Sequence, residues 1–492
     1  MDIYTKIIGI RIKEITMNKK VVLILVVLLA VAMLFTACGE NYDYKLTDYV
    51  DYSEEEVVGN GGMAVKQGNY LYFVNGVSDY TSDNTFKNVV KGAIMRYDIK
   101  TDGSLDIDSL KTVVPKKVFS SYVGAGIYVY GEWIYYVTPA NVVDRDGNAL
   151  TDYVEFMRTK TDGSGTEVLL RVKGNTVEYA FSENALVYYL DGVLYSAKLQ
   201  RNTTPVVITD EATGYAFAKN MDYNPDSTAK SADSYVYYTK ASETTTDTNN
   251  ELWVAGFDFA ESGYNEKVIG KFSYMSDAEK TAYEDLTDTT DTYNDKMFTV
   301  SILSYADGKL YYTKSIIDGT TTTAVGTYSY DMSAYLNMTE PEFDKAKEIK
   351  YTDTAYATIY ETGTAGEVIV GDGSKLHLLK KDGADWKYDR VCFNSNVTVI
   401  DVFGGYLYYN ASSSNDVYKF NLNGEDTAVK LTDATPDKSY LVPEIMDGML
   451  FYVHPDYKYV YVTDLDNGVD EMLGEYNATD KATIEELEGD EE

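Results

Sequence analysis

The sequence predicts an all-β protein: a β-propeller of four-stranded antiparallel blades that follows an N-terminal lipoprotein signal peptide. Three observations predict the propeller. A tyrosine-rich strand recurs along the chain, Asp-Gly or Asn-Gly pairs mark the turns after it, and the copies are spaced by roughly 40–75 residues. Repeats of this kind are typical of propellers, in which blades stack around an axis because one four-stranded sheet cannot cover its own two faces.

The recurring strand combines aliphatic residues with a tyrosine pair. A degraded copy is expected at Glu367–Val370, because the downstream elements of the other copies follow it. The clear copies are Tyr70–Val74, Trp133–Val137, Leu186–Leu190, Tyr235–Thr239, Leu310–Thr313, Tyr406–Tyr409 and Leu450–Val453. Eight units over residues 60–475 average about 52 residues, slightly above the usual blade length. We therefore predict eight blades, or seven if the degraded copy is an insertion. A β-sandwich is the competing fold, but its strands would not recur in this fixed order.

Each copy is followed by a second strand that ends at a turn. Ile94–Asp98 precedes Asp102-Gly103, and Leu376–Leu379 precedes Asp382-Gly383. Such pairs tolerate the positive φ angles of tight hairpins, so each unit is interpreted as a meander of antiparallel strands. The strands expected in the last unit are Tyr440–Ile445, Met449–Val453, Tyr459–Thr463 and Asp470–Leu473.

The N-terminus has the three parts of a secretory signal. Lys19 and Lys20 precede an apolar run, Val21–Leu34, and the small pair Thr36-Ala37 precedes Cys38. We predict that residues 1–37 are removed, with 17–37 as the true signal after Met17, and that the Cys38 thiol carries lipid. The competing interpretation is an uncleaved transmembrane anchor. Residues 38–59 are then a lipidated acidic tether.

Other segments lie outside the repeat pattern. Residues 60–475 are expected to form the propeller and residues 476–492 an acidic tail. A capping-box arrangement at Ser276 predicts a helical insertion that runs to about Lys296. Thr339–Lys347 is expected to be a short second helix, and Thr320–Thr323 a loop tip.

Acidic residues dominate the charge of the chain. There are 43 Lys and Arg residues against 78 Asp and Glu residues, a formal net charge of −35. Nucleic acid is disfavoured as a partner, because phosphate binding needs clustered basic side chains. The acidic excess has two interpretations: attraction of cations or basic partners, and solubility of a surface protein. We favour solubility, because the acidic residues are dispersed through the turns. We expect the protein to be monomeric.

No catalytic, cofactor or metal-binding motif is present. The two histidines, His377 and His454, have no partner at metal-ligand spacing, so we expect no cofactor and at most adventitious calcium. Asp144–Asn148 has the glycine in the wrong place for a calcium loop and is interpreted as a turn. Cys392 is expected to be a lone buried thiol. Paired carboxylates for glycoside hydrolysis stay open, because acidic residues are so numerous.

The tyrosine pairs carry a resemblance. Tyr237-Tyr238-Thr239-Lys240 and Tyr311-Tyr312-Thr313-Lys314 resemble the motifs of YWTD and TolB-like propellers. The chain is more closely similar to uncharacterised β-propeller lipoproteins of Gram-positive gut anaerobes. The second position of the motif holds Tyr or Phe where the YWTD family has Trp, so ligand residues of that family are not carried over. The resemblance implies a scaffold for binding and no chemistry.

These observations predict a lipid-anchored protein on the extracytoplasmic face of the cell membrane, at the cell surface. We expect it to act as a ligand-binding or protein-interaction scaffold, not as an enzyme. Its expected partners are the membrane, through lipid on Cys38, and a glycan, peptide or protein ligand. The alternative is a carbohydrate-active enzyme that uses carboxylates at the axial opening. Aromatic residues and paired Asp or Glu converging on one mouth would favour the enzyme, and scattered loop polarity would favour the binder.

Overall fold

The structure is a computed structural model. The residues that it describes are 44–46, 55–78, 84–119, 126–148, 150–174, 177–218, 231–241, 250–258, 265–273, 296–318, 320–336, 338, 343–395, 397–412, 414–424, 427–437, 441–466, 468 and 470–489. The predicted signal peptide, Cys38 and the helical insertion after Ser276 lie outside these residues.

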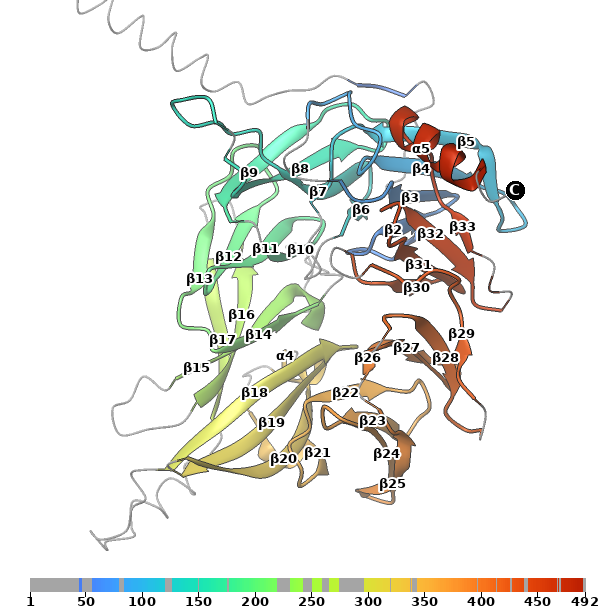
Figure 1. Ribbon diagram of the computed structural model, residues 1–492. Helices are drawn as coiled ribbons and strands as arrows, with labels where there is room; N and C mark the ends of the chain where they lie inside the picture. The colour runs from blue at the N-terminus through green and yellow to red at the C-terminus, as the bar shows by residue number, and fades with distance from the viewer. Residues whose placement is uncertain are drawn as a thin grey trace, which may run out of the picture.

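The described strands form eight antiparallel sheets arranged in a ring (Figure 1). Within each sheet the strands pair in chain order, and sheets that follow one another in the chain are neighbours in the ring. Seven sheets have four strands, and the first has five. We number the sheets as blades 1 to 8 in chain order.

The first four blades occupy the N-terminal half of the chain. Blade 1 contains β1 (Val57–Val58), β2 (Ala64–Gln67), β3 (Tyr70–Val74), β4 (Ile94–Ile99) and β5 (Leu105–Val114). Blade 2 contains β6 (Tyr128–Tyr130), β7 (Trp133–Pro139), β8 (Tyr153–Lys160) and β9 (Glu167–Lys173). Blade 3 contains β10 (Glu178–Phe181), β11 (Ala185–Leu190), β12 (Val193–Lys198) and β13 (Val206–Thr209). Blade 4 contains β14 (Gly214–Phe217), β15 (Tyr235–Ala241), β16 (Asn250–Asp258) and β17 (Asn265–Ser273), with a 3-10 turn, η1 (Ala232–Ser234), before β15.

The other four blades complete the ring. Blade 5 contains β18 (Lys296–Ala306), β19 (Lys309–Asp318), β20 (Thr321–Asp331) and β21 (Ile349–Thr352), with α4 (Met332–Leu336) and η3 (Lys345–Lys347) between the last two strands. Blade 6 contains β22 (Thr358–Glu361), β23 (Glu367–Gly371), β24 (Leu376–Asp382) and β25 (Asp385–Phe393). Blade 7 contains β26 (Val397–Phe403), β27 (Tyr406–Ala411), β28 (Val417–Asn421) and β29 (Val429–Lys430). Blade 8 contains β30 (Glu444–Met446), β31 (Met449–Val453), β32 (Val460–Asp464) and β33 (Asp470–Met472), and α5 (Ala478–Gly489) follows it.

The predicted fold class, a propeller of four-stranded antiparallel blades, is confirmed. The degraded motif Glu367–Val370 lies in β23, the second strand of a complete sheet, and is therefore not an insertion. The predicted turns at Asp102-Gly103 and Asp382-Gly383 are also present, with positive φ at the glycine of each. Asp307-Gly308 and Asp447-Gly448, which precede motif strands, have positive φ at both residues, as a tight hairpin requires.

The structure differs from the sequence predictions at a few boundaries. Pairing begins at Val57, before the predicted start of the propeller at residue 60, because β1 adds to β2. Thr321–Thr323 belong to β20 and are not a loop tip, since β19 and β20 form one long hairpin. In the described part of Thr339–Lys347, only Lys345–Lys347 are helical, as a 3-10 turn.

Tyrosine rings fill the seams between blades, and their hydroxyls bond the neighbouring backbone. Tyr128 and Tyr130 of β6 donate to the carbonyls of Tyr179 and Phe181 in β10, at 3.3 and 2.8 Å. The first strand of a blade is a sheet edge, so its backbone groups need partners outside the ladder. Tyrosine provides both apolar area and a donor for this purpose. Tyr128 and Tyr130 thus serve the packing of blade 2 against blade 3.

Side chains of blade 1 bond the free edge of β6 in the same way. Asn60 is buried, accepts from the Val129 amide at 2.7 Å and donates to the Val129 carbonyl at 3.3 Å. Gln67 donates to the carbonyl of Gly131 at 2.9 Å. These bonds fix blade 2 against blade 1 at the centre of the ring.

Blades 1 and 8 close the ring although they lie at opposite ends of the chain. The Asn75 amide donates to the carbonyl of Glu475 at 2.9 Å, and the Val77 amide donates to the carbonyl of Lys458 at 2.7 Å. Phe451 and Val453 of β31 are fully buried in one apolar core with the strands of blade 1. Closure therefore relies on packing between two complete sheets.

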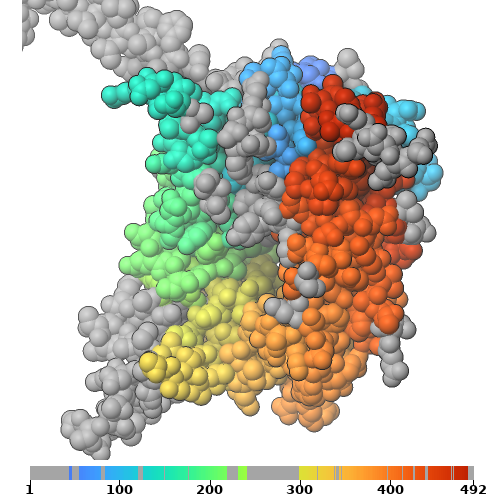
Figure 2. Space-filling view, in the orientation of Figure 1, coloured from blue at the N-terminus to red at the C-terminus, as the bar shows by residue number. Residues whose placement is uncertain are grey.

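Helix α5 strengthens this closure. Its first turn is capped by Asn477, whose oxygen accepts from the amide of Asp480 at 2.8 Å. The Asp480 carboxylate accepts from Tyr459 of blade 8 at 2.8 Å and pairs with Lys91 of blade 1 at 3.0 Å. The red helix accordingly lies beside the blue first sheet in Figures 1 and 2. Residues predicted to be an acidic tail thus include a helix that links the first and last blades.

Replacing Asp480 with asparagine is expected to lower the free energy of unfolding at pH 7 by about 1 kcal/mol. Partial burial acts to raise the pKa of Asp480, but hydrogen bonds from Tyr459 and Lys91 outweigh it and the pKa is lowered. A lowered folded-state pKa contributes stability above the unfolded value of about 3.9 and loses it as the pH falls through the folded value. The difference in the free energy of unfolding between D480N and the unaltered protein, measured by urea titration, should therefore become smaller below pH 4. The exposed Glu485 on the same helix provides the control, since E485Q should change little at either pH.

The structure also describes the predicted lone cysteine and the helices. Cys392 is buried, its thiol lies 3.3 Å from the carbonyl oxygen of Leu376, and burial raises its pKa to about 11, so it behaves as the predicted inert thiol. Among the helices of the described residues, none has the length and apolar character that crossing a membrane requires.

Candidate functional site

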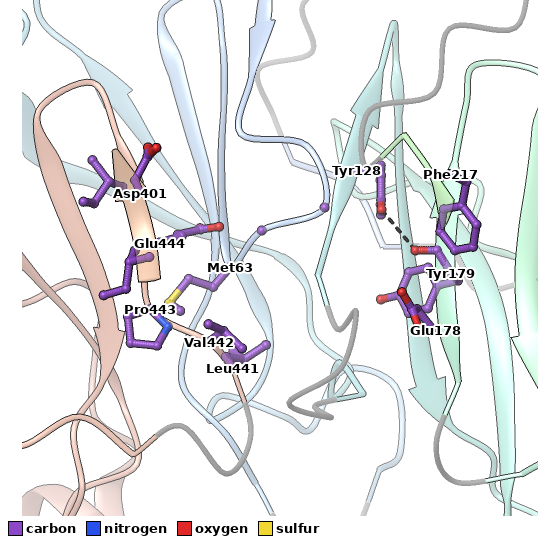
Figure 3. A pocket seen from close by; sticks show the side chains of 14 residues that line it. Met63, Tyr128, Glu178, Tyr179, Phe217, Asp401, Leu441, Val442, Pro443 and Glu444 are labelled. Atoms are coloured by element: carbon purple, nitrogen blue, oxygen red, sulfur yellow. Dashed lines mark hydrogen bonds between the residues drawn. The ribbon is translucent and has the colours of Figure 1, made fainter. Parts of the chain in front are cut away.

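A cavity of about 550 Å³ lies inside the ring, between blades from opposite sides (Figure 3). Its walls come from the first strands of blades 2, 3, 4, 7 and 8 and from Gly61, Gly62 and Met63, which lead into β2. In the ribbon view the blades of the two halves of the chain lie on opposite sides of the ring (Figure 1). The cavity is therefore assembled by ring closure, since no single blade contains it.

Three carboxylates line the cavity. Asp401 of β26 and Glu444 of β30 lie on one wall, and Glu178 of β10 lies on the wall opposite (Figure 3). No lysine or arginine is among the described residues of the lining. Low-dielectric walls that carry one sign of charge concentrate the field within a cleft. The cavity is accordingly suited to a cationic group.

The chain folds Glu444 into this position through blade closure. Its carboxylate accepts a hydrogen bond from the backbone amide of Ala64 at 2.8 Å. Ala64 lies in the part of β2 that does not pair with β1, so this bond gives it a partner. A Cβ atom on Gly62 would lie 1.7 Å from the other carboxylate oxygen. Residue 62 therefore has to be glycine for the Glu444 carboxylate to stay where it is.

Glu178 is held by the adjacent blade. It accepts a short hydrogen bond, 2.5 Å, from the hydroxyl of Tyr215 in β14. Two causes raise the pKa of Tyr215 well above its usual range: burial, which is the larger, and this hydrogen bond to the carboxylate. The tyrosine consequently stays a neutral donor, and the carboxylate stays at the wall of the cavity.

Aromatic residues complete the wall that contains Glu178. Tyr128, Tyr179 and Phe217 line the cavity there (Figure 3). The Tyr179 hydroxyl accepts from the Gly126 amide at 3.0 Å and donates to the Gly126 carbonyl at 2.6 Å. Burial raises the pKa of Tyr128 far above its usual range. The Tyr128 and Tyr179 rings are thus fixed by the seam between blades 2 and 3 and are almost fully buried, whereas Phe217 is partly exposed.

The histidines singled out in the sequence lie elsewhere. His377 in β24 pairs with Asp372 at 2.9 Å, and His454 follows β31, where its ring stacks on Tyr457 at 4.4 Å. Neither lines the cavity. Asp144 accepts from the amides of Asp146 and Asn148, both at 2.8 Å, as a turn residue does. Within the described part of the chain, no group of three His, Cys, Asp or Glu side chains is arranged to hold a metal ion.

Sequence reasoning did not single out any of the cavity carboxylates. Glu178, Asp401 and Glu444 lie in short strands before the tyrosine motif, among many other acidic residues. Their position in the repeat could have identified them. Each lies in the strand that precedes a motif strand, and a propeller places this first strand of each blade at the axis.

The chain resembles known proteins in its fold only. No family model matches the chain, and no curated protein matches it. Apo AztD from Citrobacter koseri is similar over 82% of this chain and 95% of its own, at 10% identity and a TM-score of 0.38. The β-propeller domain of Myceliophteria thermophila Cps50 (Swd1) is similar over 67% and 93%, at 12% identity and a TM-score of 0.34. An uncharacterized protein from Listeria monocytogenes EGD-e is similar over 73% and 94%, at 8% identity and a TM-score of 0.35. These values support no functional transfer, and the resemblance to lipoproteins of gut anaerobes stays a prediction.

Proposed function

We propose that this protein is a lipid-anchored binding module of the cell surface that takes a cationic ligand into its axial cavity. The observation that carries the proposal is the convergence of Glu178, Asp401 and Glu444 with aromatic side chains on one cavity. An ammonium or guanidinium group is attracted both to carboxylates and to the faces of aromatic rings. The ligand is therefore an amine or a basic peptide segment that enters along the axis.

The surface location rests on the N-terminal sequence. Lys19 and Lys20, the apolar run Val21–Leu34 and Thr36-Ala37 before Cys38 are the parts of a lipoprotein signal. The same lipid would keep the cavity close to the membrane.

A carbohydrate-active enzyme is the second candidate. The convergence of carboxylates and aromatic residues at the axis is the arrangement that the sequence analysis associates with an enzyme. Glycoside hydrolysis also requires two carboxyl groups that flank the scissile bond. Binding is favoured over hydrolysis because two of the three carboxylates already join blades. Glu444 accepts from the Ala64 amide and Glu178 from the Tyr215 hydroxyl. In these positions they act as parts of the ring closure as well as walls of the cavity.

Neutralising a cavity carboxylate is expected to weaken ligand binding about tenfold, or about 1.4 kcal/mol. An array of amines, amino sugars, Lys- and Arg-containing peptides and neutral glycans on the soluble 39–492 protein would find the ligand. Calorimetry would then compare D401N, E178Q and E444Q. Asp401 is exposed, so D401N tests charge with little effect on folding. D382N, in an exposed turn of blade 6, removes the same charge far from the cavity and should bind normally.

Mass spectrometry of the same mixtures separates the two candidates. Saturable binding without new products, weakened by D401N and by added salt, supports the binding module. Release of glycan products that stops in E178Q or E444Q would replace it with the enzyme. Binding that is indifferent to all three substitutions would place the ligand outside the cavity.

A further inference from the structure

A short N-terminal segment, Tyr44–Leu46, lies against the outer rim of the ring, at the seam between blades 1 and 2. The Tyr44 hydroxyl donates to the carbonyl of Thr112 in β5 at 3.0 Å, and the Leu46 amide donates to the carbonyl of Asp162 at 2.7 Å. Strand β5 is the last strand of blade 1, and Asp162 lies in the turn between the last two strands of blade 2. The segment thus bridges two blades at their outer edges.

The segment is packed as well as hydrogen-bonded. Leu46 is only 9% exposed and belongs to the core shared by blades 1, 2 and 8, and the Tyr44 ring meets Phe86 edge-on at 6.5 Å. A Cβ atom on Gly163 would lie 2.8 Å from the Tyr44 ring, so the turn and the ring are in close contact. Lys45 lies 4.0 Å from the Asp162 carboxylate. Contacts of Tyr44 and Leu46 therefore hold the chain at this seam, and the exposed Lys45 adds only one long ion pair.

Docking at Tyr44 shortens the tether that the sequence suggests. Residues 38–59 were expected to be one spacer between the lipid and the propeller, yet Tyr44 is already bound to the rim. Only residues 39–43 separate it from Cys38. A chain reaches at most about 3.3–3.6 Å per residue, so the rim lies within about 20 Å of a lipid on Cys38.

We infer that Tyr44–Leu46 orient the propeller edge-on at the membrane, with the seam of blades 1 and 2 facing the bilayer. Blades 5 and 6, on the opposite side of the ring, then point away from the membrane (Figure 1). The axis lies along the membrane plane, and the cavity opens sideways rather than toward the lipid. This inference rests on the lipid at Cys38 that the proposed function contains.

Energy transfer to a membrane dye tests the orientation. The lipidated full-length protein, with Cys392→Ala, is placed in phosphatidylglycerol vesicles that contain an acceptor-labelled lipid. A donor is attached to D108C on the exposed part of β5 or to D382C in the turn of blade 6. Transfer should be several-fold stronger from position 108. Equal transfer from both positions, or stronger transfer from position 382, would overturn the edge-on orientation.

Variants of the docked segment show whether it sets the orientation. Combining Tyr44→Ser with Leu46→Ser removes the ring contact and the buried side chain, and should bring the two donor positions to similar transfer. Lys45→Ala is the matched control, because Lys45 is exposed and makes one long ion pair, so the difference should persist. A difference that survives the double change would overturn the role of the segment. Mass spectrometry of Cys38 and vesicle flotation show separately whether the protein is lipidated and membrane-bound. A missing lipid would refute both the anchoring and the orientation. A lipidated protein without a preferred orientation would refute only the orientation.

Discussion

Replacing Gly126 with alanine is expected to destabilise the protein by about 2–4 kcal/mol. A Cβ atom at this position would lie 2.2 Å from the carbonyl oxygen of Gly61 and 2.4 Å from its carbon. Both are backbone atoms, so no side chain can rotate away to make room. Shifting the segment would also break the bonds between Gly126 and the Tyr179 hydroxyl. Urea unfolding followed by circular dichroism would measure the loss.

Gly103 provides the matched control for this substitution. It has a φ of +85° in an exposed turn, and a Cβ there would meet nothing within 4 Å. G103A should therefore cost only the backbone strain, about 1 kcal/mol. A loss for G126A no larger than that for G103A would contradict the close approach of blades 1 and 2 at the axis. A large loss for G126A should be accompanied by weaker ligand binding, since Gly61 and Tyr179 line the cavity.

Replacing Glu155 with glutamine is expected to cost about 3–5 kcal/mol, because a buried cation then loses its counter-charge. Glu155 of β8 and Lys116, which follows β5, are each only 1% exposed. The Lys116 ammonium lies 3.6 Å from one oxygen of Glu155, and Arg171 of β9 bonds the other oxygen. The pair connects blades 1 and 2 through the interior of their seam. Thermal and urea unfolding of E155Q measure the effect.

Two further variants separate a buried charge from a lost contact. Changing Lys116 to methionine and Glu155 to leucine together should recover most of the stability, because no unpaired charge is left inside. The ion pair of Asp382 and Lys387 is exposed to solvent. Its loss in D382N should therefore lower the free energy of unfolding by at most about 0.5 kcal/mol. If the double variant is no more stable than E155Q, packing rather than charge explains the loss.

The strands were the most predictable part of the fold. Met449–Val453 was predicted from its sequence and is β31, and the last strand, predicted as Asp470–Leu473, is β33, Asp470–Met472. Both results depend on local causes, namely the residues that favour strands and the turn at Asp447-Gly448 with its positive φ angles. The first strand of the same blade was predicted too early, as Tyr440–Ile445, whereas β30 covers Glu444–Met446. No turn motif marks where that strand begins.

The cavity was not predictable in the same way. Glu178 and Glu444 lie far apart in the chain, and what brings them to one cavity is the closure of blade 8 on blade 1. The sequence predicts that carboxylates converging at the axis would matter for function. It contains 78 acidic residues, however, and no local pattern distinguishes those that reach the axis. Position relative to the axis, rather than residue type, distinguishes the carboxylates that line the cavity.

The sequence by itself determined the class of fold, the identity of the repeating unit and the acidic composition, because each depends on neighbouring residues or on composition. The lipoprotein signal before Cys38 stays a prediction from the sequence. The tertiary structure alone decided which side chains face the axis, how Asp480 and Asn75 link the first and last blades, and where Tyr44 docks on the rim. The physical reason is range. Strand and turn preferences act over a few residues, whereas ring closure joins groups 400 residues apart, such as Asn75 and Glu475, through packing that no local pattern encodes.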